Sequence, residues 1–145
     1  MNPPDLDRFV DAQRSIYPAV LDELRTGHKR SHWMWFIFPQ LRGLGRSPTA
    51  IAFGIASRAE AEAYLAHAVL GPRLEECTRL VLTHAGRTLN EIVGSPDDLK
   101  FRSSMTLFAV VAESHSSPFR RAIESFCGGE MDTRTLEMLG GGQNS

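Results

Sequence analysis

Positively charged side chains gather in one stretch of the chain that holds no carboxylate. Between Leu24 and Ala59 there is no Asp or Glu, but there are six basic residues: Arg25, Lys29, Arg30, Arg42, Arg46 and Arg58. A segment of one sign raises the local concentration of anions, and the planar guanidinium of arginine matches phosphate in a bidentate manner. The basic 25–58 segment therefore predicts either an anion-binding site or a solvated basic face.

Two glycines and a serine lie inside this segment, in the stretch RGLGRSP at residues 42–48. Gly43 and Gly45 allow the backbone to approach a ligand closely, and Ser47 before Pro48 is typical of the start of a helix. The stretch is neither a Walker loop nor a dinucleotide fingerprint, because it lacks the Lys-Ser or Lys-Thr pair and no strand precedes it. A tight connecting turn explains these residues equally well.

Polar residues recur in the helix that we expect to follow residue 96. Asp97, Lys100 and Ser104 fall on one face of it, and Asp98 has the i,i+4 spacing of an ion pair with Arg102. These side chains could form the wall of a pocket for acid–base work on a small substrate. Alternatively, the hydroxyls in this helix bond back to carbonyls four residues earlier.

Histidines and cysteines offer weaker signals. His32 adjoins both the basic residues and an aromatic run, and an imidazole titrates near neutrality. His28 and His32 have i,i+4 spacing but no nearby carboxylate, so we expect no metal site. Cys77 and Cys127 fall on apolar helix faces, which favours buried, unreactive thiols over nucleophiles.

The leading hypothesis is an enzyme that binds a phosphate-bearing, nucleotide-like molecule between the basic segment and the helix after residue 96. The reaction that we consider first for this enzyme is the hydrolysis of an N-glycosidic bond, and we expect it to need no cofactor. Asp98 or His32 would move protons, oriented by Lys100 and Ser104. The residues predicted to bind the ligand are Lys29, Arg30, Trp33, Trp35, Gln40, Arg42, Gly43 and Gly45.

The competing hypothesis is a non-catalytic interaction module that presents the basic 25–58 segment to an acidic partner protein. Nucleic acid is not expected as a partner, since the isoelectric point is about 6.5 and no helix carries a basic stripe with exposed aromatics. No membrane association is expected, because the longest apolar run, Trp33 to Phe38, has only six residues. We expect a monomer as the default.

The elements that must position these residues are helices. N-capping patterns begin at Ser57, Thr88, Ser95 and Ser117, and helical spacing of apolar residues recurs along the chain. The run at residues 33–38 is either a buried strand or, as we favour, a short buried helix. The sequence therefore predicts a mainly α fold, an orthogonal array of about six to eight helices with at most a minor strand element.

Length and composition predict one domain. The chain has 145 residues, 42% of them hydrophobic and 23% charged, which suits a single core and excludes collagen-like or wholly disordered classes. We expect one globular domain over residues 1–145, frayed at 1–4 and 140–145. Two unpaired cysteines and a start without a secretory pattern predict a cytoplasmic location.

Two motifs carry a resemblance over nearly the whole chain. They are KRSHWMWFIFPQ at residues 29–40, followed by GLG at 43–45, and Lys100 followed by SSMTLF at 103–108. In these residues the chain closely resembles a bacterial and fungal family called domain of unknown function 1810. The resemblance implies a compact, mainly helical, cytoplasmic domain and supplies no activity.

Members of that family are often labelled calpastatin, a label that this sequence does not support. Calpastatin-type inhibitors are long, disordered and poor in core residues, whereas this chain has capped amphipathic helices and a tryptophan-rich centre. Another small helical bacterial family hydrolyses N-glycosidic bonds of phosphorylated or ADP-ribosylated compounds, and its motifs do not occur here. That comparison is an analogy of fold and only suggests which reaction to consider first.

Overall fold

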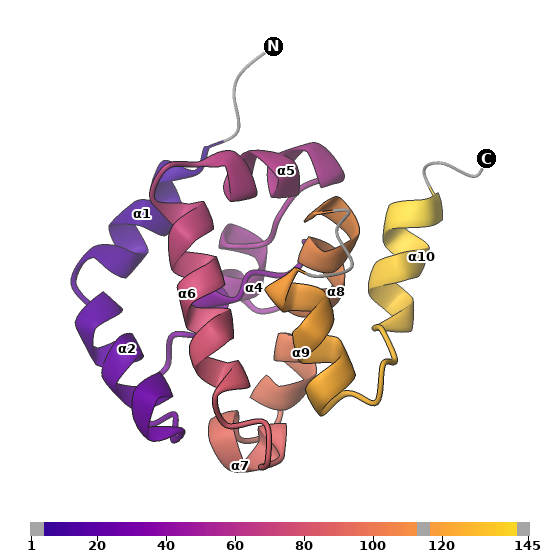
Figure 1. Cartoon of the computed structure of the whole chain (residues 1–145). Helices are drawn as coiled ribbons and strands as arrows, with labels where there is room; N and C mark the ends of the chain where they lie inside the picture. Colours follow the sequence, from indigo (N-terminus) through magenta and orange to yellow (C-terminus); the bar gives the residue numbers. More distant parts are fainter. Residues whose placement is uncertain (1–4, 113–116, 142–145) are drawn as a thin grey trace.

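The chain folds into an array of short and long helices that pack around one another (Figure 1). The computed structural model describes residues 5–112 and 117–141. Within these ranges there are ten helices: α1 (Asp7–Arg14), α2 (Tyr17–Thr26), α3 (Met34–Ile37), α4 (Pro48–Ala52), α5 (Arg58–Ala66), α6 (Leu70–Leu82), α7 (Leu89–Val93), α8 (Asp97–Ala112), α9 (Pro118–Phe126) and α10 (Thr133–Gly141). The mainly helical class is confirmed, and the count exceeds six to eight because α3, α4 and α7 are helices of only four or five residues.

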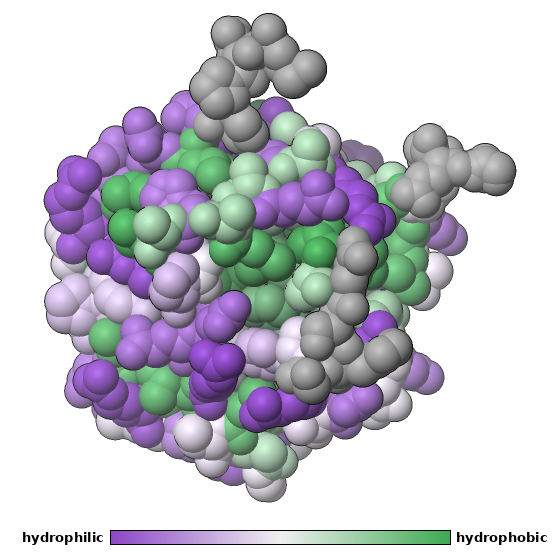
Figure 2. Space-filling model, turned by 45° about the horizontal axis from the view of Figure 1, so that its top comes forward, coloured by the Kyte–Doolittle hydropathy of each residue, from purple (hydrophilic) through white to green (hydrophobic). Residues whose placement is uncertain are grey.

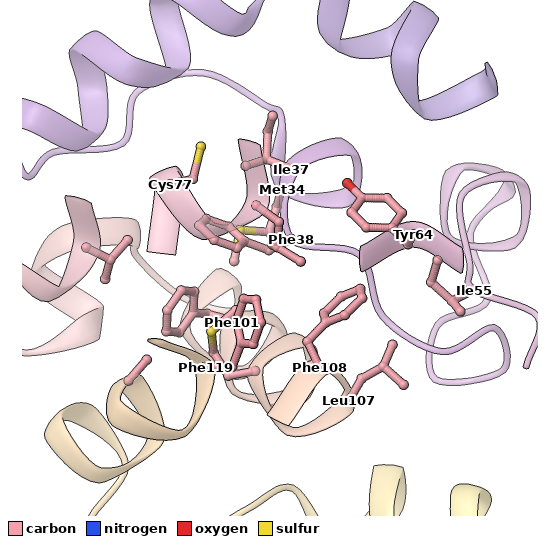
Figure 3. Packing of buried hydrophobic residues seen from close by; sticks show 14 of the residues in the cluster. Met34, Ile37, Phe38, Ile55, Tyr64, Cys77, Phe101, Leu107, Phe108 and Phe119 are labelled. Atoms are coloured by element: carbon pink, nitrogen blue, oxygen red, sulfur yellow. The ribbon is translucent and has the colours of Figure 1, made fainter. Parts of the chain in front are cut away.

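The core forms around α8, the longest helix, which packs against α5, α9 and α10. Its Phe101 and Phe108 are fully buried, and rings from other helices surround them (Figure 3). Phe38 meets Phe101 edge-on at a centroid distance of 4.9 Å, and Phe119 lies 5.9 Å from Phe108. Aromatic pairs in these geometries add to the free energy gained by burial. The core therefore holds α8 firmly, and α8 carries Asp97, Lys100 and Ser103 of the candidate site.

The aromatic run at residues 33–38 contains the short helix α3, as expected. Trp33 and Phe38 flank this helix and are buried, whereas Trp35 keeps part of its side chain exposed. After it, Leu41 and Ile55 form an isolated parallel bridge, the only strand-like pairing in the described parts of the chain. This bridge closes the loop that carries the glycines of the basic segment.

Capping side chains fix half of the helix starts in the described residues, among them those that the sequence predicted at Ser57, Thr88 and Ser117. Ser57 accepts a hydrogen bond from the backbone N–H of Glu60, and Thr88 and Glu91 form a complete capping box. Ser117 and Asp132 cap α9 and α10. Ser95 makes no such cap, and α8 begins two residues later, at Asp97.

Most of the chain ends that we expect to be frayed cannot be compared with the structure. Residues 1–4 and 142–145 lie outside the described residues, so the expectation is not tested there. Gly140 and Gly141, however, belong to α10, because the helix continues past the expected stop. The expected fraying over residues 140–145 therefore stays a prediction.

One face of the molecule shows how polar and apolar residues share the surface. In Figure 2, hydrophobic residues gather toward the middle of the face, and hydrophilic residues lie around them. Several large apolar side chains elsewhere are exposed, among them Ile51, Leu99 and Met138. None of the helices in residues 5–112 and 117–141 has the length and hydropathy needed to cross a bilayer.

The two thiols differ in accessibility, which gives a testable expectation. Cys77 is buried on α6, and burial raises the pKa of its thiol to about 12. Cys127 is half-buried, and burial raises its pKa as well. Because the thiolate is the reactive species, a disulfide reagent at pH 8 should modify at most Cys127 in the folded protein and both residues in urea. Rapid modification of Cys77 in the folded state would contradict this.

Candidate functional site

Two cavities lie side by side where the basic segment meets α8. The larger, of about 500 Å³, has polar and charged residues from three parts of the chain in its lining: Gln40, Arg46, Ser47, Lys100, Ser103, Asp132 and Arg134. The smaller, of about 290 Å³, has Lys29, His32, Thr49, Asp97 and Lys100 in its lining. Both volumes are in or near the range in which proteins bind small molecules.

Trp35 and Lys100 belong to the lining of both cavities and form the wall between them. The Lys100 ammonium lies 4.7 Å from the centroid of the Trp35 ring, within the range of a cation–π interaction. Gly45 leaves room for the ring, because a Cβ atom at this position would lie only 3.0 Å from Trp35 and 2.8 Å from Ala50. The close approach of this glycine is therefore to Trp35, on the wall of the larger cavity.

One carboxylate holds two ammonium groups beside the smaller cavity. Lys29 Nζ lies 2.7 Å from one oxygen of Asp97, and Lys100 Nζ lies 3.4 Å from the other. The Lys29 side chain is 7% exposed and also lies over the ring of Trp33, at 5.1 Å from its centroid. These contacts join the loop before α3 to the first turn of α8.

A buried carboxylate fixes the loop that carries Lys29 and His32. Glu23 accepts hydrogen bonds from the backbone N–H groups of Arg30 and Ser31, from the Ser31 hydroxyl and from Trp33 Nε1. Burial by itself raises the pKa of Glu23, but these hydrogen bonds outweigh it and lower the pKa to about 2. Glu23 is therefore ionised near neutral pH. Because it accepts the hydrogen bond of the Trp33 indole, this N–H is not available to a ligand.

The wall of the larger cavity contains a buried donor without a partner. Gln40 is 4% exposed, and its Nε2 makes no hydrogen bond to any described residue. Most buried polar atoms are satisfied, so an exception in a cavity wall points to a ligand or to water. Nearby, the Ser103 hydroxyl donates to the carbonyl of Leu99 and can still accept a bond from the cavity.

A capping network positions the third part of the larger cavity. The Thr106 hydroxyl donates to the carbonyl of Arg102 and accepts from the N–H of Asp132. Asp132 in turn accepts from the backbone N–H and the hydroxyl of Thr135, and so caps α10. This network fixes the start of α10, where Arg134 enters the cavity lining.

The structure brings six of the predicted site residues to the two cavities: Lys29, His32, Trp35, Gln40, Gly45 and Lys100. Six others lie elsewhere: Arg30, Trp33, Arg42, Gly43, Asp98 and Ser104. Arg30 and Gly43 are exposed outside both linings, whereas Trp33 and Ser104 are buried in the core. Trp35 is thus the one tryptophan that a ligand in either cavity can reach.

Arg42 and Asp98 lie on other cavities. The Arg42 guanidinium donates to the carbonyls of Ile51 and Gly54 and so ties the loop together. Asp98 belongs to the lining of a cavity on the other side of α8, and its carboxylate accepts from the N–H of Leu99. The expected ion pair of Asp98 with Arg102 is replaced by bonds from Arg102 to the carbonyls of Glu130 and Met131.

Comparison with known proteins gives the chain a family. The sequence model of the family described as "Protein of unknown function (DUF1810)" matches residues 3–139. The chain belongs to this family. The chain is also similar to the conserved hypothetical protein Rv1873 from Mycobacterium tuberculosis, whose crystal structure is known. The two sequences are 54% identical, the alignment covers 95% of this chain and 98% of that chain, and the TM-score is 0.91. Among curated proteins, none matches the chain.

Several polar residues that line the two cavities of this DUF1810 protein were not among the predicted site residues: Arg46, Ser47, Thr49, Asp97, Ser103, Asp132 and Arg134. Asp97 was placed on the right helix face but given no role. Asp132 caps α10, and only the packing of α10 against α8 brings it and Arg134 to the cavity. In the described ranges, no group of three or more His, Cys, Asp or Glu side chains is placed to hold a metal ion.

Proposed function

We propose that this protein binds a small, phosphate-bearing, nucleotide-like molecule in the larger cavity and acts on it as an enzyme. The buried Gln40 amide carries the proposal, because its Nε2 has no hydrogen-bond partner and Gln40 belongs to the lining of a cavity that cations surround. Leaving a buried donor unpaired costs about 1–3 kcal/mol, a cost that a ligand acceptor would remove.

The charges around the cavity favour an anion. Arg46, Lys100 and Arg134 contribute three positive charges to the lining, and Asp132 contributes one negative charge that already caps α10. Arg46 and Arg134 are exposed, so their guanidinium groups can turn toward a ligand without breaking packing. Arginine pairs with phosphate through two parallel hydrogen bonds, which gives geometric selectivity as well as attraction.

The shape of the site favours a ligand with a planar group. Trp35 is a half-buried indole at the boundary of both cavities, and one polar partner, Lys100, already lies over it. Aromatic rings in such positions bind nucleobases by stacking. A cavity of about 500 Å³ accommodates a molecule of nucleotide size.

Hydrolysis of an N-glycosidic bond is the first reaction to assay. In it, water adds to the glycosidic carbon, the carbon–nitrogen bond breaks and the leaving nitrogen takes a proton. His32 is exposed at the smaller cavity beside Asp97 and Lys100, where an imidazole can deliver or accept that proton. Lys100 would orient the anionic part of the substrate from the shared wall.

A thermal-shift screen with the variant Gln40→Leu tests the proposal. Leucine has a similar volume and removes the unpartnered donor, so the free variant should be as stable as the wild type or more stable. The screen uses nucleotides, ADP-ribose, sugar phosphates and flavin precursors. We expect at least one compound to raise the melting temperature of the wild type by several degrees and to shift Gln40→Leu by less than half as much.

Gln13→Leu is the matched control, since Gln13 is also buried but fully bonded. Its Nε2 donates to the carbonyl of Phe36 and to Tyr64 Oη, and its Oε1 accepts from Arg73. This variant should lose about 2 kcal/mol of stability and keep the ligand-induced shift. A Gln40→Leu protein destabilised like Gln13→Leu, or shifted by ligand like the wild type, would contradict the assigned role.

The alternative function, an interaction module, has a different expected result. It predicts that no compound stabilises the wild type, and that an acidic protein co-purifies at low salt and dissociates as the salt concentration rises. A screen without any shift would therefore overturn the small-molecule proposal in favour of this module.

A further inference from the structure

The smaller cavity carries an excess of positive charge in a half-buried place. Lys29, Lys100 and Asp97 are 7%, 26% and 17% exposed at their side chains, and two ammonium groups share the one carboxylate. The only other titratable side chain in the lining is His32, which does not reduce this excess. The cluster therefore keeps one positive charge that no described carboxylate neutralises.

Such an arrangement is costly without an anion. Charges withdrawn from water are usually paired, because removing their hydration costs several kcal/mol per ion. Lys29 gives the stronger argument for a missing anion, because its side chain is more than nine-tenths buried and it shares its carboxylate partner with Lys100. A further anion beside Lys29 and Lys100 would complete the pairing.

The hydrogen-bonding groups of the cluster leave donors available. An ammonium group has three N–H donors, and each of these two uses one on Asp97 and directs its charge to one indole ring. Both oxygens of Asp97 are occupied by the lysines. The cluster can therefore donate to an incoming anion, and its two ammonium groups outweigh the charge of its one carboxylate.

We infer that the smaller cavity is a second anion subsite, and that the ligand of this protein carries two anionic groups, one in each cavity, with Lys100 between them. The inference rests on the proposed function, because it names the second charged group of the same ligand. It points to a nucleotide-like molecule with two phosphate groups in preference to a monophosphate. Of the two lysines, Lys29 lines the smaller cavity alone, whereas Lys100 lines both.

Inorganic phosphate is the probe, because it occupies a phosphate subsite whatever the rest of the ligand is. The backbone and indole N–H signals of ¹⁵N-labelled protein are followed by NMR as phosphate is added at constant ionic strength. We expect two groups of signals to move with separate dissociation constants, one around residues 29–33 and one around residues 44–47 and 132–134. The same addition of chloride should move neither group.

Variants separate the two subsites. Lys29→Met should abolish the response at residues 29–33 and keep the other, while Lys29→Arg, which retains the charge, should restore it. Arg46→Ala with Arg134→Ala should do the reverse, and both arginines are exposed, so the fold should be retained. Lys29→Met leaves Asp97 paired with Lys100, which protects its fold as well.

The outcomes distinguish this inference from the proposed function. A response only around residues 44–47 and 132–134 would overturn the second subsite and leave the larger cavity as the binding site. A response only around residues 29–33 would overturn the larger cavity as a phosphate site, and with it the ligand with two anionic groups. No response in either region, or an unchanged response in Lys29→Met, would overturn the inference as well.

Discussion

Replacing Asp97 by alanine is expected to lower the free energy of unfolding by about 3 kcal/mol, which for a chain of this size lowers the melting temperature by about 10 °C. Asp97 is the carboxylate that both Lys29 and Lys100 share. Its removal leaves two ammonium groups close together, and one of them is nearly buried. Thermal and urea-induced unfolding measure the loss.

The neighbouring residue provides the control for this prediction. Asp98 also lies in the first turn of α8, but its carboxylate bonds only to the N–H of Leu99 among the described contacts. Asp98→Ala should therefore cost less than 1 kcal/mol. The double variant Lys29→Met, Asp97→Ala should recover part of the loss, because it removes the buried charge with its partner. Equal effects of the two aspartate variants would contradict the shared ion pair.

Replacing Glu23 by glutamine is expected to cost about 3 kcal/mol at pH 7. The hydrogen bonds that Glu23 accepts lower its pKa to about 2 from an ordinary value of 4.5, and this difference of more than two pH units corresponds to about 3 kcal/mol. Glutamine keeps the size of the side chain and an acceptor oxygen for Trp33 Nε1, so the variant isolates the effect of the charge. Urea-induced unfolding at pH 7 measures it.

The same residue predicts a pH dependence with a definite sign. Because the pKa of Glu23 is lower in the folded protein, its contribution is complete above about pH 4.5 and is lost as the pH falls toward 2. The wild type should lose stability in this window more steeply than Glu23→Gln, so the two curves converge in acid. Glu124→Gln, at an exposed position of α9, should follow the wild type. Parallel curves for Glu23→Gln and the wild type would contradict the role of Glu23.

Local chemistry made most of the helices predictable. Caps such as Ser57, Thr88 and Ser117 satisfy free backbone donors with neighbouring residues, so their effect is visible in a few residues of sequence. Gly71 and Pro72 lie in the first turn of α6, although a Gly-Pro pair is more typical of turns and loops. Proline is tolerated there because the first N–H groups of a helix have no partner within it.

The candidate site was predictable only in part, since it depends on contacts between distant segments. The sequence indicated that the basic segment and the helix after residue 96 would meet, and the two cavities lie between them. It favoured Asp98 for proton transfer, whereas Asp97 lines the smaller cavity. Neighbouring helical residues point about 100° apart, and only the packing of α8 orients them. Arg134 reaches the larger cavity only because α10 packs against α8, and no local sequence pattern specifies this packing.

The pairing at Asp97 also places every lysine ammonium group of the chain at the candidate site, which matters for reagents that modify lysine. The sequence has fourteen arginines but only two lysines, and both of these ammonium groups meet at one carboxylate beside the cavities. Acylation of either lysine removes a charge from the candidate site and from nowhere else on the side-chain surface. Coupling the protein to a support through its lysines would therefore block the cavities, whereas coupling through Cys127 would leave them open.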